Sequence, residues 1–136
     1  MRSTRGAAIV EFALAWPVAL LLVLGSVELA VWSAESFAAR SAALAGARAA
    51  SVAGSQDVAV PVTLRALAPS LVGVRAAEWC PGRAETTPPL WVCAADLGSA
   101  VQVDVGGSVP ALMPLTPGRG LPIHAHAVVQ KEIFAR

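Results

Sequence analysis

The feature that most limits how this chain can fold is a long apolar segment near its N-terminus, residues 7–27, in which Glu11 is the only charged residue. A helix of that length spans about 30 Å, which is about the thickness of the hydrocarbon core of a bilayer. Arg2 and Arg5 precede the segment, and Glu28 is the first acidic residue after it. Because basic flanks stay in the cytoplasm, we predict one membrane-spanning helix with its N-terminus inside and the rest of the chain outside.

The length and composition of the whole chain suit a single small domain. The chain has 136 residues, of which 56% are hydrophobic and 14% charged, with a net charge of +1. Ordinary soluble domains carry about 25% charged residues, so this chain is poor in charge. Its high apolar content excludes a protein that is disordered because it is rich in charge. The ten basic residues are dispersed and balanced by nine acidic ones, which argues against a nucleic-acid partner.

A cleaved secretory signal is the alternative reading of this segment, with residues 20–24 as its apolar centre. The small-x-small cleavage pattern that should follow is missing there, and the nearest match, residues 43–45, lies too far downstream. Pro17 falls inside the segment, and membrane helices tolerate a proline better than soluble helices do. We therefore expect the helix to be retained.

Glu11 is the residue that most narrows the function. A carboxylate at mid-bilayer costs about 2.5–3.5 kcal/mol and less near the interface, so an acid inside a span is a functional candidate. The simpler alternative is that its side chain reaches the cytoplasmic interface. The surrounding sequence, RGAAIVEF at residues 5–12, places a glycine and four mainly apolar residues between a short basic leader and this acid.

That sequence resembles the leader junction of type IV prepilin-like proteins. The resemblance implies that a prepilin peptidase removes a leader of residues 1–6 by cutting between Gly6 and Ala7, so that Glu11 becomes the fifth residue of the mature chain. Gly6 has no side chain, which lets a protease approach its peptide bond closely. Cleavage frees the Ala7 amine, and by resemblance to pilins this ammonium pairs with Glu11 of a neighbouring subunit and sets axial register. Buried ion pairs are better at fixing register than at adding stability.

Residues 5–50 resemble the TadE-like family, the minor pseudopilins of the tight-adherence (Flp) pilus. The likeness adds Pro17, Glu28, Gly46 and Arg48 to the junction motif. It implies a non-enzymatic subunit of a Flp/Tad-type pilus or a related type II/IV secretion filament, with a part in cell adhesion. The implied partners are a prepilin peptidase, other pilins or pseudopilins, the inner-membrane assembly platform and the lipid bilayer. The implied location is the bacterial cytoplasmic membrane or an extracellular pilus, and no cofactor is implied.

The helix is expected to continue beyond the membrane over residues 28–54, because this stretch lacks proline and is rich in alanine. An i+4 row of small residues runs along it, which either admits a close partner helix or arises by chance from the alanine content. This row consists of Ala30, Ala34, Ala38, Ala42, Gly46, Ala50 and Gly54. Residues 54–57 predict a helix stop, after which Asp57 caps a short helix ending at Leu67, with Pro61 in its first turn.

Residues 55–136 predict a small extracytoplasmic cap. Strands are expected at residues 74–80, 90–93, 101–105 and 123–130, with Gly106-Gly107 ending the third strand and residues 110–122 forming a loop. The expected fold class is therefore α+β: a long N-terminal transmembrane, pilin-like helix carrying a small, mainly antiparallel sheet of three or four strands.

Two cysteines flank the loop between the first two predicted strands. Outside the cytoplasm, Cys80 and Cys93 are most simply a disulfide, and the alternative is a pair of free thiols. Trp79 and Trp91 beside them are expected to be core or subunit-contact residues.

No catalytic or metal centre is predicted. His124 and His126 alternate on a predicted strand, but catalytic zinc needs three protein ligands and no motif supplies a third. Nucleophile, phosphate-loop and dinucleotide motifs are missing from the sequence as well. The alternative to a pseudopilin is therefore a membrane-anchored extracytoplasmic domain that binds a ligand or partner without any filament role.

Overall fold

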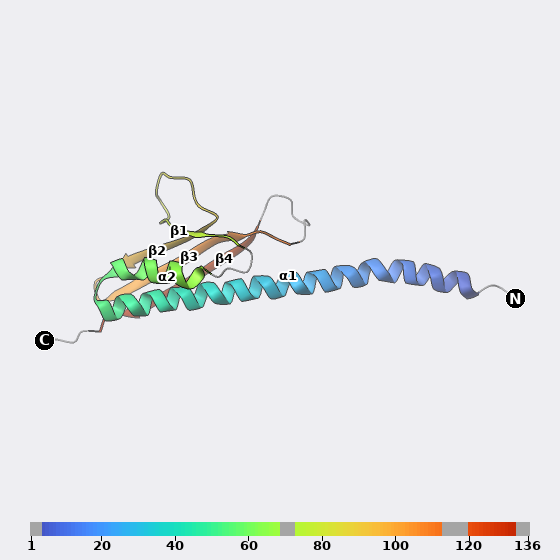
Figure 1. The fold of residues 1–136 in the computed structure, drawn as a ribbon, viewed down its shortest axis with the longest axis horizontal. Coiled ribbons are helices and arrows are strands. Elements are labelled where there is room, and N and C mark those ends of the chain that lie inside the picture. The colour runs from blue at the N-terminus through green and yellow to red at the C-terminus, as the bar shows by residue number, and fades with distance from the viewer. Residues whose placement is uncertain (1–3, 69–72, 113–119, 133–136) are drawn as a thin grey trace.

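One long helix organises the whole molecule. The computed structural model describes residues 4–68, 73–112 and 120–132. Helix α1 (Thr4–Ala53) runs nearly the length of the molecule, and its N-terminal half extends free of the rest of the chain (Figure 1). Its 50 residues correspond to about 75 Å at 1.5 Å per residue. The predicted continuation of the helix beyond residue 27 is present, and it ends at Ala53.

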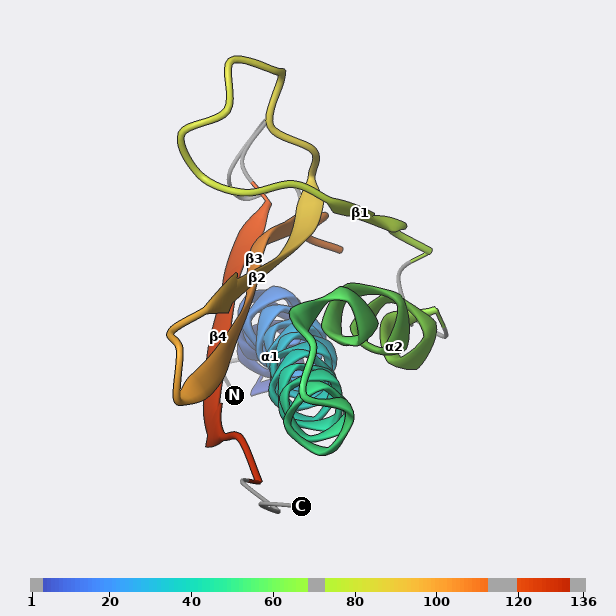
Figure 2. The same ribbon diagram turned by 90° about the vertical axis from the view of Figure 1, so that its left-hand side faces the viewer.

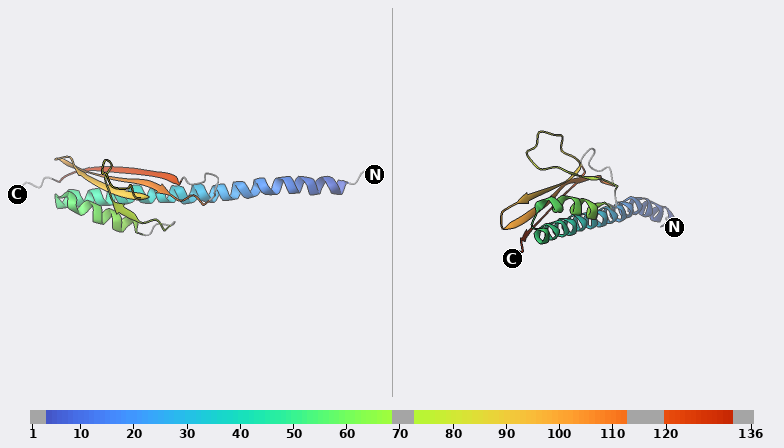
Figure 3. Two further views of the ribbon diagram at one scale, coloured as in Figure 1. Left: turned by 90° about the horizontal axis from the view of Figure 1, so that it is seen from above. Right: turned by 60° about the vertical axis from the view of Figure 1, so that its left-hand side comes forward.

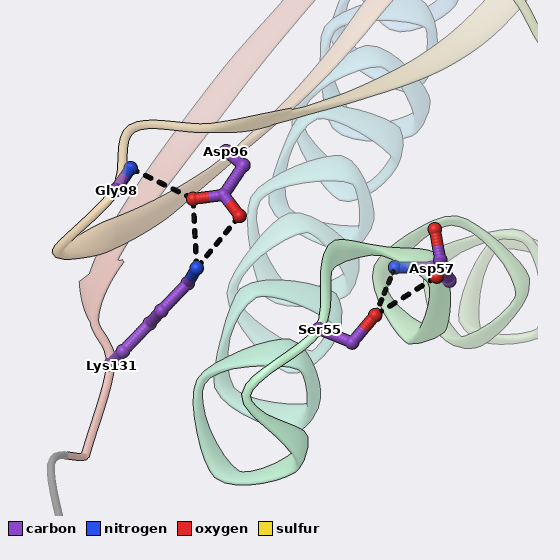
Figure 4. Close-up of polar contacts among 5 residues, drawn as sticks. All are labelled: Ser55, Asp57, Asp96, Gly98 and Lys131. Atoms are coloured by element: carbon purple, nitrogen blue, oxygen red, sulfur yellow. Dashed lines mark hydrogen bonds and ion pairs between the residues drawn. The ribbon is translucent and has the colours of Figure 1, made fainter.

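The end of α1 follows from local backbone chemistry. Gly54 adopts a φ of +68°, a conformation that side chains disfavour, and it reverses the chain directly after Ala53. Ser55 then accepts a hydrogen bond from the Asp57 N–H at 3.2 Å and caps the short 3-10 helix η1 (Gln56–Val58). Ser55, rather than the predicted Asp57, is therefore the capping residue (Figure 4).

A second helix, α2 (Ala59–Leu67), follows η1 without a side-chain cap of its own. Pro61 is its third residue and lies in the first turn, where a missing N–H has no cost. α2 lies alongside the C-terminal half of α1, while the sheet covers another side of the same stretch (Figures 2 and 3).

The sheet contains four strands in the order β1-β2-β3-β4, with β1 (Ala76–Glu78), β2 (Leu90–Asp96), β3 (Ala100–Val109) and β4 (Leu121–Gln130). The pairings β2–β3 and β3–β4 are antiparallel, as expected, whereas β1 pairs with β2 in parallel. The fold class is α+β with a mixed sheet. The parallel pairing arises because the long connection from β1 returns to the same end of the sheet before β2 begins.

The third strand is longer than the sequence predicts, because its two glycines do not end it. A side chain at Gly106 would meet the indole of Trp91, and one at Gly107 would meet the backbone of Pro89 and Leu90. The glycines therefore let the neighbouring strand and its tryptophan approach closely, and pairing continues to Val109. The last strand is also longer at its start, since it begins at Leu121 inside the predicted loop. The middle of that loop lies outside the described residues.

The core of the cap is built from small residues on α1 and β-branched residues on the sheet. Ala39, Ala43 and Ala47 of α1 are fully buried, as are Val103 and Val105 of β3. Alternate residues of β4 complete this layer, while the residues between them are exposed. Alanines on the helix allow the sheet to lie close to the α1 backbone.

The small-residue row on α1 also has a structural role in its central part. Ala42, Gly46 and Ala50 are buried, whereas Ala30 and Ala34 are exposed. The partner helix that approaches this central part is α2 of the same chain.

Candidate functional site

The N-terminal half of α1 is an exposed apolar surface. Ile9, Phe12 and Leu22 each expose 69% or more of their area, and the other large apolar side chains within residues 9–27 are also exposed. Within the described residues, α1 is the one helix long and apolar enough to cross a membrane, with a mean hydropathy of 2.1 in that stretch. Such a surface is stable only against lipid or against other apolar protein surfaces.

The predicted cleavage junction lies at the start of this helix. Gly6 and Ala7 fall in the first turn of α1, and nothing lies within 4 Å of where a side chain on Gly6 would begin. Glu11 lies one turn further along and is exposed, and no described side chain bonds to it. Gly6 and Glu11 are thus accessible to an approaching protein.

The other residues of the predicted family signature lie far from this junction and do not form one site with it. Pro17 lies inside α1 and is exposed. Gly46 packs against α2, where an added Cβ would lie 2.8 Å from the carbonyl oxygen of Ala59. Arg48 is exposed, and Glu28 is half-buried. Gly46 lies about 50 Å along the helix from Glu11, so the signature residues are spread along one helix and are not gathered in one place.

Comparison with known protein families shows which family the sequence of this helix resembles. The model of the TadE-like protein family matches residues 6–48. The N-terminal segment is TadE-like. The match begins at Gly6 and ends within α1, so it includes Glu11 and Gly46 but none of the strands. No curated protein and no solved structure matches this chain.

The match confirms the resemblance found in the sequence. The TadE-like family consists of pilus components rather than enzymes, and the apolar N-terminal helix fits a membrane-anchored protein related to the Tad pilus. The cap lies beyond the TadE-like segment, so its features rest on the structure alone.

The cap contains the predicted disulfide. Cys80 and Cys93 are bonded, with a Cα–Cα distance of 4.9 Å, and the exposed loop of residues 81–87 projects from the sheet beside them (Figure 1). Trp79 is buried and meets the half-buried Trp91 edge to face, with ring centroids 5.6 Å apart. The bond and the indole pair together hold β1 against β2.

The two histidines of β4 do not form a metal centre with other described residues. His124 and His126 are exposed on the outer face of the sheet, with ring centroids 6.5 Å apart. Within residues 4–68, 73–112 and 120–132, no group of three or more histidine, cysteine, aspartate or glutamate side chains is placed to hold an ion.

An ion pair that the sequence did not predict joins the far end of the sheet. The Nζ atom of Lys131 donates to both carboxylate oxygens of Asp96, at 2.8 and 2.7 Å (Figure 4). This bond, together with one from the Gly98 N–H, lowers the pKa of the Asp96 carboxyl below its ordinary value. The two residues are 35 positions apart, so no local sequence pattern could have revealed the contact.

A second contact that the sequence did not predict lies at the opposite end of the sheet. The indole Nε1 of Trp32 donates to the carbonyl oxygen of Pro122 at 3.0 Å and joins α1 to the start of β4. A tryptophan shortly after a membrane span is recognisable in the sequence as a membrane-interface residue. Its hydrogen-bond partner, 90 positions further along the chain, cannot be recognised in this way.

Proposed function

We propose that this chain is a TadE-like minor pseudopilin that a prepilin peptidase cleaves between Gly6 and Ala7 and that then takes part in assembling a Flp/Tad-type pilus. Residues 1–6 are the leader, 7–27 the membrane segment, 28–54 the outer part of the helix and 55–136 the cap. The protein resides in the cytoplasmic membrane with the cap outside, and its partners are pilins or pseudopilins and the assembly platform.

One observation carries this proposal: the TadE-like match begins at the glycine of the junction and contains an exposed carboxylate in an apolar helix. A carboxylate in that position is costly unless something recognises it. Glu11 lies about 6 Å beyond Ala7 along the helix axis, so a new ammonium at Ala7 and the carboxylate lie at similar depths in the membrane. A neighbouring subunit shifted slightly along the axis can therefore pair its ammonium with this carboxylate.

Cleavage is the first step to test. The full chain, co-expressed with its cognate prepilin peptidase, is expected to yield a mature protein whose N-terminal sequence begins at Ala7. An active-site variant of the peptidase is the control and should leave the leader intact. If the leader remains with the active enzyme, the chain is a plain membrane anchor carrying an extracytoplasmic domain.

The role of Glu11 is tested separately from cleavage. Removing one partner of a buried ion pair costs about 3–5 kcal/mol, which corresponds to at least a 100-fold loss in assembly. Glu11→Ala and Glu11→Gln should therefore both insert into the membrane and fail to enter filaments. Glu78→Ala, which removes an exposed carboxylate from β1, is the matched control and should assemble normally. Filaments containing Glu11→Gln subunits at the wild-type level would contradict the register role.

A further inference from the structure

The two ends of the sheet differ in chemistry, and one of them lies close to the predicted membrane boundary. β3 ends and β4 begins at the end facing the free half of α1 (Figure 1). At this end Trp32 of α1 holds the start of β4 through its hydrogen bond to Pro122. Trp32 lies five residues beyond the membrane segment, or about 7 Å along the helix axis, which is the depth of lipid headgroups.

A small pocket lies at this junction. It has a volume of about 190 Å³ and is lined by Gly25, Glu28, Leu29, Trp32 and Leu121. Gly25 belongs to the membrane segment, whereas Leu121 belongs to the cap. The pocket therefore crosses the predicted level at which α1 leaves the bilayer, and Glu28 is the charged residue among these five described lining residues.

Exposed apolar side chains surround this end of the cap. Leu29 exposes 62% of its area, and Leu112, which follows β3, exposes 58%. The opposite end also exposes two apolar side chains, Leu97 and Val128, but it carries the ion pair between Asp96 and Lys131 beside them. A tryptophan whose polar atom is satisfied and whose ring lies among leucines is typical of protein at a membrane interface.

We propose that this end of the cap is a lipid-binding surface, in which an acyl chain of an outer-leaflet phospholipid occupies the pocket between Leu29, Trp32 and Leu121. The pocket is continuous with the lipid-facing surface of α1, so a lipid reaches it without leaving the bilayer. A whole helix from a second copy, which is about 10–12 Å wide with its side chains, does not fit inside a pocket of about 190 Å³. The cap then rests against the leaflet and is held at a fixed tilt to the membrane.

The inference rests on the membrane anchoring in the proposed function but not on cleavage or pilus assembly. Photolabelling of the full chain tests it, in phosphatidylcholine vesicles containing a phospholipid with a diazirine in its acyl chain. Adducts are located by peptide mass spectrometry. Labelling is expected in α1 before residue 28 and also at Leu112 and Leu121. Two residues at the far end of the sheet provide matched controls: Leu97, which is 54% exposed, and Val128, which is 52% exposed. Both should be labelled several-fold less.

Two variants sharpen the comparison. Leu112→Asp places a charge at the lipid-facing end and should lower cap labelling several-fold, whereas Leu97→Asp places it at the far end and should have no effect. Both leucines are exposed, so neither substitution disturbs the core.

Each remaining outcome contradicts the proposal in a distinct way. Labelling of α1 without labelling of Leu112 or Leu121 refutes the lipid surface and leaves the membrane anchor intact. Failure to label α1 refutes the anchor itself. If cap labelling falls as the protein density in the vesicles rises, a second copy of the chain displaces the lipid. The assignment of the pocket to a lipid is then wrong.

Discussion

The close approach of α1 and α2 at Gly46 yields the sharpest prediction for stability. At a solvent-exposed position away from the ends of a helix, replacing glycine with alanine stabilises the protein by about 1 kcal/mol. At Gly46 the new Cβ would lie 2.8 Å from the carbonyl oxygen of Ala59, against an ordinary contact distance of at least 3.4 Å. It would also overlap the hydroxyl of Thr63, which is fully buried and donates to that same carbonyl at 2.8 Å.

α2 must therefore move away by about 0.6 Å or more, because a backbone atom and a stiff β-branched side chain block the Cβ together. Overpacking of this kind costs about 1–3 kcal/mol, and the upper part of that range applies here. After subtracting the helix-propensity gain, Gly46→Ala should destabilise the cap by about 1–2 kcal/mol. For a cap of this size, the melting temperature should fall by at least about 4 °C.

Thermal unfolding of the full chain in detergent micelles, followed by near-ultraviolet circular dichroism of the cap tryptophans, measures this change. Ala45→Gly, at the exposed neighbouring position, gives the propensity effect alone and should cost about 1 kcal/mol. Thr63→Ala removes the hydroxyl that the new Cβ would overlap, so the double variant should be less unstable than the sum of the two single variants. A Gly46→Ala protein that melts above the wild type would refute the close packing of α1 and α2.

Three further predictions concern the cap. Reduction of the bond between Cys80 and Cys93, or its removal by a paired change to serine, should destabilise the cap by about 3 kcal/mol, as measured by chemical unfolding with and without reductant. The pKa of Asp96 is lowered in the folded state, so its stabilising contribution is present above the ordinary pKa of the group and is lost as the pH falls through the lowered value. An NMR titration should show this low midpoint and its return toward the ordinary value in Lys131→Gln, and an unchanged midpoint would contradict the ion pair. Trp32→Phe keeps an aromatic ring, although a smaller one, but loses the hydrogen bond to β4. It should increase amide exchange at the start of that strand while exchange at the far end stays constant.

The sequence predicts α1 well because a helix depends on local properties of the chain. Helical hydrogen bonds join residues four apart, and membrane insertion depends on the summed hydropathy of a continuous segment. Glu11 could be singled out for the same reason, since an acid in an apolar run is visible without any knowledge of the fold. The disulfide was accessible because two cysteines leave one pairing.

The strands were located by their alternating pattern, but their ends and one pairing direction were not. From the sequence, Gly106 was expected to end its strand, but the structure shows that the glycine makes room for the indole of Trp91. β1 pairs with β2 in parallel because the long connection between them returns to the end of the sheet at which β1 starts. The row of small residues on α1 was visible in the sequence, yet its partner was not, because nothing local indicates that α2 folds back onto Gly46.

The sequence by itself therefore determined a long apolar N-terminal helix with a TadE-like sequence, an α+β fold and one disulfide. Tertiary structure alone decided which contacts hold the cap together and hold it to the helix: Asp96 with Lys131 within the cap, and Gly46 with Thr63 and Trp32 with Pro122 between α1 and the cap. The physical reason is the separation along the chain. The energies of helix formation and lipid burial depend on neighbouring residues, whereas these three contacts exist only after segments 17 to 90 positions apart have been brought together by the core.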